Sequence, residues 1–272
     1  MPDSSDPRPA VAVTLAPLDS DPRAGLRSAA SLMVRGVQVS AGQVGTRARD
    51  LDQSGRRDLL IAARRLELDV VGIDAWFTPE DLLDSARVDD AMTALLATIE
   101  LASDLGAIPV STRFPCEGGE EAIEALMAAG NRVGVSLVDH GVPPRGLSVR
   151  PIDAGRPPSG LVIPGSTAEV AISSPPTGEP IEGLGVGIDP PSWLVAGFDP
   201  FDAAGRGAWS LRLADLTADG MRVPAGDPDG RVDPRSLLAA ARTGGLRYLP
   251  IIDARRWLDP PAGVRSTLAS LG

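Results

Sequence analysis

The segment from residue 68 to residue 114 constrains the fold more than any other part of the chain. LDVVGIDAW (Leu68–Trp76) and AIPVSTRF (Ala107–Phe114) are short apolar runs, and the Val- and Ile-rich first run is typical of a strand covered on both faces. Between them, VDDAMTALLATIELASDLG has apolar residues at three- and four-residue spacing, acids in its first turn and Gly106 at its end. Two buried strands joined by a helix form a parallel pair, and a parallel sheet needs helices on its faces.

The same unit recurs along the chain. Six further segments read as strands: 10–15, 36–41, 133–140, 183–189, 208–216 and 246–253. Several helical segments open with Asp-Pro, in which Asp accepts the first free amides and Pro fixes the entry dihedral. This alternation predicts an α/β protein with a (β/α)8 TIM barrel, formed by residues 10–272 after a disordered tail of residues 1–9. A doubly wound open sheet is the alternative fold.

Residues 141–183 depart from the alternation. The stretch is crowded with Pro and Gly, and it shows no helical period. A barrel places a helix here, so we expect an irregular segment to replace the helix after strand five.

Composition excludes several classes of function. A net charge of −10 argues against a nucleic-acid surface, which needs clustered cations. The 26 basic residues are all arginine, so Schiff-base chemistry through a lysine is excluded. The single cysteine cannot form an internal disulfide. No secretory signal or membrane span is visible, so we expect a cytoplasmic protein with no membrane partner.

Three segments carry a resemblance to a known family. GVQVSA, DLDQSGRRDLLIAARRLELDVVGIDAWF and VDDAMTALLATIELASDLGAIPVS resemble the sugar phosphate isomerase/epimerase family, which has a xylose isomerase-like barrel. GIDPPSWLVAGFDP and the terminal DPPAGV helix extend the resemblance over most of the chain. The resemblance implies a sugar or sugar phosphate ligand and proton transfer next to its carbonyl, at the C-terminal face of the barrel.

The same resemblance implies a divalent metal ion, held by Glu, Asp, His and Glu at the ends of strands five to eight. In this sequence Val138 stands at the first position and Asp189 at the second. Strand seven has no His, and strand eight offers Asp253 but no Glu. Asp189 is therefore the only clean match, and the sequence leaves open whether a divalent metal ion binds.

Three residues at strand ends are candidates for catalysis. Asp189 and Asp253 supply carboxylates, and His140 is the only histidine and the natural proton carrier near neutral pH. Each also has a structural interpretation. Asp189 precedes Pro190, so a helix cap explains it equally well, and a lone strand-end His is commonly a hydrogen-bonded structural residue.

A further set of strand-end residues is predicted to bind the substrate. Carboxylates and guanidinium groups can grip sugar hydroxyls, and an indole can stack on a sugar ring. A surface Asp-Arg pair over a packed Trp is the alternative interpretation near strand eight. The set is Asp74, Trp76, Arg113, Asp139, Arg212, Arg255 and Trp257.

Three functions remain open from the sequence. The first is an isomerase or epimerase acting on a sugar or sugar phosphate. The second is a catalytically inactive barrel that has lost the metal site and only binds a small ligand or a protein partner. The third is a scaffold or oligomeric partner without a ligand.

Overall fold

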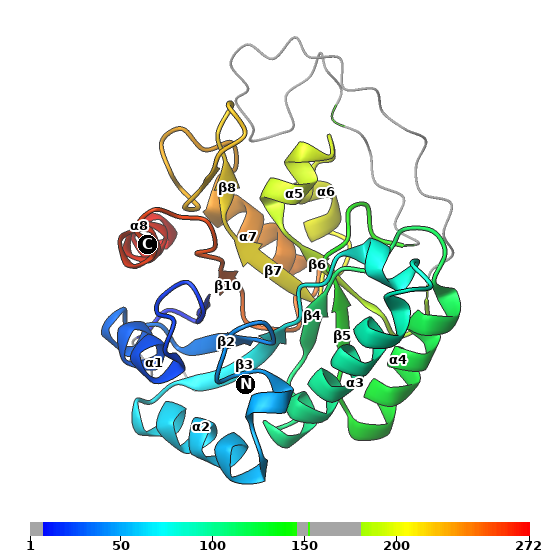
Figure 1. The fold of residues 1–272 in the computed structure, drawn as a ribbon. Helices are drawn as coiled ribbons and strands as arrows, with labels where there is room; N and C mark the ends of the chain where they lie inside the picture. The colour runs from blue at the N-terminus through cyan, green and yellow to red at the C-terminus, as the bar shows by residue number, and fades with distance from the viewer. Residues whose placement is uncertain (1–7, 146–151, 153–180) are drawn as a thin grey trace.

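Eight parallel strands close into a barrel surrounded by helices (Figure 1). The computed structural model describes residues 8–145, 152 and 181–272. The strands follow one another around the barrel in the order β1–β10–β7–β6–β5–β4–β3–β2. This closed order confirms the TIM barrel and excludes the open sheet.

The barrel strands are short, and their register sets which side chains meet. They are β1 (Ala12–Thr14), β2 (Gly36–Ser40), β3 (Asp69–Asp74), β4 (Val110–Thr112), β5 (Leu137–Asp139), β6 (Gly185–Ile188), β7 (Ser210–Leu213) and β10 (Ile251–Ile252). Pairing places Asp74 beside Ser40 on one side and Ser111 on the other. The last strand is much shorter than the predicted segment 246–253.

Helices follow the strands as the alternation predicts. They are α1 (Pro22–Ser31), α2 (Gln53–Arg65), α3 (Val88–Asp104), α4 (Glu120–Val133), α5 (Pro190–Val195), α6 (Pro200–Ala204), α7 (Pro234–Thr243) and α8 (Pro260–Leu271), with 3-10 turns η1 (Ala48–Asp50) and η2 (Pro79–Leu82). The carboxylates that precede α1, α6, α7 and α8 accept backbone N–H groups of the first turn, as expected for Asp-Pro starts: Asp21, Asp199, Asp233 and Asp259.

The predicted strand at 208–216 is wrong in its second half. β7 ends at Leu213, and Asp215–Leu216 form β8, which pairs antiparallel with β9 (Arg222–Val223) outside the barrel. The buried Asp215 carboxylate stabilises this excursion, because it accepts hydrogen bonds from the backbone N–H of Leu216 at 2.7 Å and of Val232 at 2.9 Å. The hairpin places Arg222 at the start of β9.

The segment after strand five is only partly described. Residues 141–145, 152 and 181–184 contain no helix, and the rest of the predicted excursion at 141–183 lies outside the described residues. Residues 1–7 of the predicted tail also lie outside them. Arg8 Nη1 donates a hydrogen bond to the carbonyl of Glu67 at 2.6 Å, so this part of the tail contacts the barrel.

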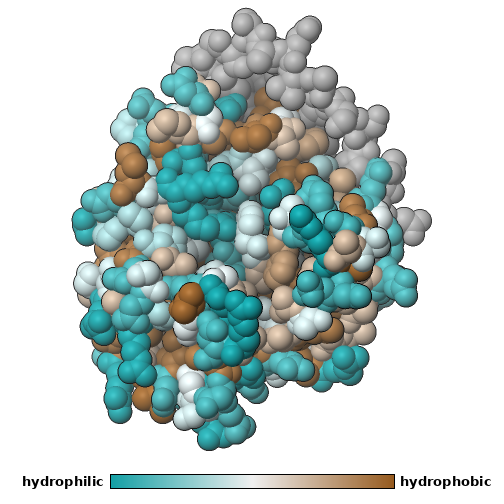
Figure 2. Space-filling view, in the orientation of Figure 1, coloured by the Kyte–Doolittle hydropathy of each residue, from teal (hydrophilic) through white to brown (hydrophobic). Residues whose placement is uncertain are grey.

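Hydrophobic and hydrophilic side chains are divided between the barrel wall and the surface. Apolar residues of the strands and of the inward helix faces form one continuous core. Figure 2 shows hydrophilic side chains over much of the visible face, with hydrophobic ones scattered between them. Within the described part of the chain, no helix is both long and apolar enough to cross a membrane.

Candidate functional site

Polar side chains fill the barrel interior beneath its C-terminal end. Gln38 Nε2 of β2 donates to Ser111 Oγ of β4 at 3.3 Å, and Arg212 Nη1 of β7 lies 3.4 Å from Gln38 Oε1. All three side chains are buried. TIM barrels usually fill this space with branched apolar residues, so a polar interior marks this end of the barrel for a role other than packing.

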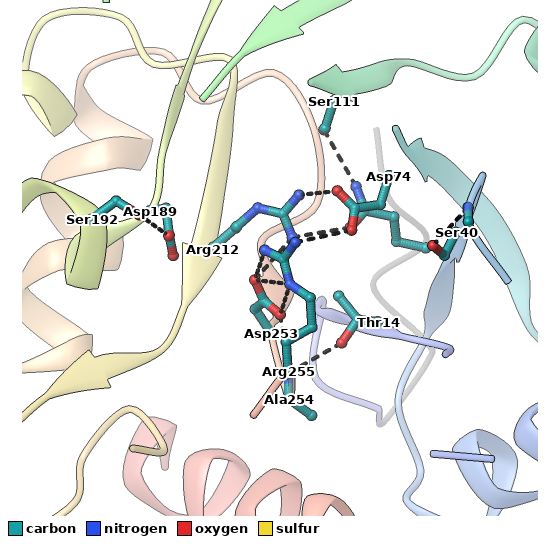
Figure 3. A network of polar contacts seen from close by, with 12 residues as sticks. Thr14, Ser40, Asp74, Ser111, Asp189, Ser192, Arg212, Asp253, Ala254 and Arg255 are labelled. Atoms are coloured by element: carbon teal, nitrogen blue, oxygen red, sulfur yellow. Dashed lines mark hydrogen bonds and ion pairs between the residues drawn. The ribbon is translucent and has the colours of Figure 1, made fainter. Parts of the chain in front are cut away.

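Arg212 is the centre of an ion-pair network. Its Nη2 lies 2.7 Å from Asp74 Oδ1 and its Nη1 lies 3.0 Å from Asp253 Oδ2, although the side chain is 0% exposed. Asp74 ends β3 and Asp253 follows β10, so one guanidinium joins two distant strand ends. Figure 3 shows the two carboxylates on either side of it.

Arg255 lies nearer the solvent and contacts the same two carboxylates. Its Nη1 lies 3.2 Å from Asp74 Oδ2, and its Nε lies 2.8 Å from Asp253 Oδ1. A further ion pair joins Arg255 Nη2 to Asp253 Oδ2. Its side chain is 25% exposed, whereas that of Arg212 is 0% exposed, and Figure 3 shows Arg255 bonded to both carboxylates.

Arg222 reaches the network from β9. Its Nη2 and Nη1 lie 2.7 and 3.1 Å from the two carboxylate oxygens of Asp189, and Nη2 also lies 2.9 Å from Asp253 Oδ2. Asp189 accepts a third hydrogen bond, from Ser192 Oγ at 2.5 Å, and makes no side-chain bond to the backbone amides of α5. Ion pairing, rather than helix capping, is therefore what holds the Asp189 side chain.

Burial and charge act against each other in this network. Burial by itself raises the pKa of Asp253, but the charges of Arg212, Arg222 and Arg255 lower it well below its usual range. The pKa of Asp189 is also lowered, because the charge and hydrogen bonds of Arg222 outweigh its burial. Both carboxylates are thus held ionised, which makes them poor proton acceptors.

Trp76 forms an aromatic platform above the network. Three guanidinium groups lie over its ring, with Cζ-to-centroid distances of 4.0 Å for Arg255, 5.1 Å for Arg212 and 5.4 Å for Arg113. The residue is 38% exposed, so a ligand at the mouth can reach the indole.

His140 and Asp139 are buried beside the network. His140 packs against Gly187 so closely that a methyl group added there would overlap the imidazole ring. Burial, with a smaller effect of Arg212, lowers the pKa of His140 well below 6.5, so the ring is neutral. Asp139 Oδ1 accepts from the backbone N–H groups of Phe114 at 3.0 Å and Gly141 at 2.7 Å, while burial raises its pKa to about 6.

The structure brings seven of the ten predicted site residues together and leaves Asp139, His140 and Trp257 outside the network, with His140 buried and both of its ring nitrogens without a hydrogen-bond partner in the described part of the chain. The network and the platform contain Asp74, Trp76, Arg113, Asp189, Arg212, Asp253 and Arg255. The Asp139 carboxylate instead accepts hydrogen bonds from the backbone N–H groups of Phe114 and Gly141. Trp257 is 9% exposed and packs against Gly263 of α8, so it belongs to the core.

Sequence reasoning missed three members of the site: Gln38, Ser111 and Arg222. A signal existed for the first two, because each is a polar residue within a short buried strand. Arg222 gave no signal, since it lies in the excursion between β7 and α7 and not at a barrel strand end.

The residues present do not fit the implied metal ion. Among the described residues, no group of three or more His, Cys, Asp or Glu side chains is placed to hold one. Guanidinium nitrogens of Arg222 already bind both oxygens of Asp189, and three arginines bind Asp253. Arginine thus supplies the positive charge that a metal would bring to these carboxylates.

Among the comparisons with known proteins, the one with solved structures finds similar proteins. No family model matches the sequence, and no curated protein matches it. A xylose isomerase domain protein from Planctomyces limnophilus aligns over 97% of this chain and 95% of its own, with a TM-score of 0.66 and 16% identity. The chain has the xylose isomerase-like barrel fold.

Other solved structures agree with this fold. A sugar phosphate isomerase/epimerase from Parabacteroides distasonis aligns over 98% of this chain and 97% of its own, with a TM-score of 0.62 and 12% identity. An L-ribulose 3-epimerase aligns over 96% and 94%, with a TM-score of 0.63 and 12% identity. The fold expected from the sequence resemblance is therefore confirmed, while the reaction has to be argued from the site.

Proposed function

We propose that this protein binds a small sugar or sugar phosphate at the C-terminal mouth of the barrel, without a metal ion. The observation that carries the proposal is that Asp189 and Asp253 form ion pairs with arginine side chains. These two carboxylates are the ones that the family resemblance would assign to metal binding and proton transfer, and both are engaged by guanidinium groups instead.

The acid–base chemistry of the site favours binding over isomerisation. A general base has to reach the substrate proton and has to have a pKa near the working pH. Asp253 and Asp189 are 0% and 1% exposed and have lowered pKa values. His140 is 0% exposed, and Asp139, with a pKa of about 6, is 2% exposed and hydrogen-bonded to two backbone amides, so neither group reaches a substrate proton.

The exposed part of the site suits a sugar. Trp76 offers an aromatic face, and Arg255 offers N–H donors beside it. Solved structures of the same fold include proteins named as a sugar phosphate isomerase/epimerase and an L-ribulose 3-epimerase, which supports sugars as the ligand class.

Calorimetry tests the proposal. The full chain is titrated with a panel of aldoses, ketoses and their phosphates, with and without EDTA. We expect at least one ligand to bind equally well in both conditions, and Trp76→Ala to weaken that binding by on the order of tenfold. Ile61→Ala, which truncates an exposed apolar residue of α2, is the matched control.

A second assay separates binding from catalysis. The ligands that bind are incubated with the protein in heavy water, and label on the carbons next to the carbonyl is followed by NMR. We expect none. Incorporation that depends on added Mn²⁺ and stops with EDTA would contradict the proposal and establish a metal-assisted isomerase.

A further inference from the structure

Among the described residues of the network and the platform, the side chains that reach solvent most are aromatic or cationic. Trp76 is 38% exposed and the Arg255 side chain 25%, whereas the side chains of Asp74, Asp189 and Asp253 are only 6%, 1% and 0% exposed. The carboxylates lie beneath the arginines that neutralise them. A ligand arriving at the mouth therefore meets indole and guanidinium groups before any carboxylate.

Arg113 differs from the other three arginines near Trp76 and the carboxylates, since no described acidic residue pairs with it. It follows β4, and its guanidinium carbon lies 5.4 Å from the Trp76 ring centroid. Among the described residues it makes no ion pair, and its Nε is buried without a hydrogen-bond partner. The charge of Asp139 acts on it from a distance, but the contacts of that carboxylate go to the backbone amides of Phe114 and Gly141.

Counted over the described residues, the network and the platform consequently have one more cation than their ion pairs use. Each carboxylate of the network binds at least one guanidinium, and one guanidinium is left over. The cations are Arg113, Arg212, Arg222 and Arg255, and the anions are Asp74, Asp189 and Asp253. Guanidinium groups at a low-dielectric, half-buried site bind oxyanions strongly, because their N–H donors match a phosphate or a carboxylate in geometry and charge.

We infer that the ligand carries an oxyanion, a phosphate or a carboxylate, which binds between Arg113 and Arg255 while the sugar ring lies on Trp76. This inference rests on the proposed function and narrows its ligand to sugar phosphates and sugar acids. Both guanidinium carbons lie close to the same ring centroid, at 5.4 and 4.0 Å, so an anion bound beside that ring lies near both charges. The charge of Arg113, which no ion pair with a described residue uses, supplies an interaction that a neutral sugar cannot make.

The test compares matched neutral and anionic ligands by calorimetry on the full chain. For each parent sugar, the neutral form, its phosphate and its carboxylic acid are titrated, and inorganic phosphate is titrated alone. Charged hydrogen bonds predict that at least one anionic form binds about ten- to a hundredfold more tightly than its neutral parent. The advantage should fall as NaCl is raised. The anionic form that binds more tightly shows whether the site recognises a phosphate or a carboxylate.

Two variants locate the anion. Arg113→Met should abolish the preference for the anionic form, and Arg113→Lys should restore part of it, because a lysine keeps the charge without the planar fork. Arg247→Met is the matched control, since Arg247 also stacks on a tryptophan, Trp209, at 3.5 Å just before β7. This control should retain the full preference. Circular dichroism and thermal unfolding verify that each variant is folded.

The outcomes separate the inference from the proposed function. Equal affinity for neutral and anionic forms, or a full preference in Arg113→Met, overturns the oxyanion site and leaves the sugar site standing. Absence of binding by every sugar overturns the proposed function. If inorganic phosphate still binds in that case and Arg113→Met removes this binding, the oxyanion site is upheld on its own.

Discussion

Arg222 binds Asp189 with both ends of its guanidinium group, at 2.7 and 3.1 Å from the two carboxylate oxygens. The arginine comes from the β8–β9 hairpin, and the aspartate follows barrel strand β6. The hairpin thus supplies the counter-charge for a carboxylate that is 1% exposed. This contact links the β8–β9 hairpin to the barrel mouth.

Removing Arg222 should destabilise the protein strongly. Arg222→Met leaves Asp189 without its bidentate partner and Asp253 with one partner fewer, and loss of a buried partner costs about 3 kcal/mol in the free energy of unfolding. Arg206→Met is the control, because its pair with Asp202 on α6 is partly exposed and is worth about 0.5 kcal/mol or less. Urea unfolding measures both losses. Similar losses in the two variants would show that the buried network contributes little.

Asp139 should make the native state less stable as pH rises. Burial raises its pKa from 3.8 to about 6, so between these values the native state holds a proton that the unfolded chain has released. The raised pKa of Asp139 therefore lowers the free energy of unfolding as pH rises from 4 to 7, by about 3 kcal/mol in total. Asp139→Asn keeps an acceptor for the Phe114 and Gly141 amides and should remove this decline. The measurement is urea unfolding at several pH values, and an identical pH slope in the variant would contradict it.

The contact between Gly187 and His140 should appear as a coupling between two substitutions. Gly187→Ala places a methyl group into the buried imidazole, and overpacking of this kind costs about 1–3 kcal/mol. In the double variant with His140→Ala the space is free, so the combined loss should be smaller than the sum of the single losses. Gly42→Ala is the control, because its nearest neighbour, Ser40 Oγ, is 3.6 Å away. Strict additivity would show that the ring moves aside without cost.

Divalent metals should leave the protein unchanged. The carboxylates that could hold an ion are engaged by arginines, so Mn²⁺, Mg²⁺, Co²⁺ and Zn²⁺ should produce no binding heat and no rise in melting temperature. A metal present at 100 times its dissociation constant would add about 2.7 kcal/mol of stability, which is easily measured. A rise with Mn²⁺ that disappears in Asp189→Asn would show that a metal displaces Arg222.

Prediction from the sequence succeeded where the signal is local. Strand ends at Asp74, Asp189 and Asp253 were located because each follows an apolar run, and parallel strands in a closed barrel direct their carboxyl ends to one face. It failed for the strand at 208–216, because an apolar run does not show where the chain leaves the sheet. Trp257 was assigned to the site because it lies two residues after Arg255, but its ring packs under α8.

The amino-acid sequence by itself determined the barrel, because apolar runs, helical periods and Asp-Pro starts are readable over a few residues. Only the tertiary structure decided the ion pairs. Arg212 is 138 residues from Asp74 and 41 from Asp253, and Arg222 is 33 from Asp189. Such pairs depend on strand register, barrel closure and the path of one hairpin, which no local pattern specifies. This is why the sequence named the carboxylates together with Arg212 and Arg255, but neither their pairing nor Arg222.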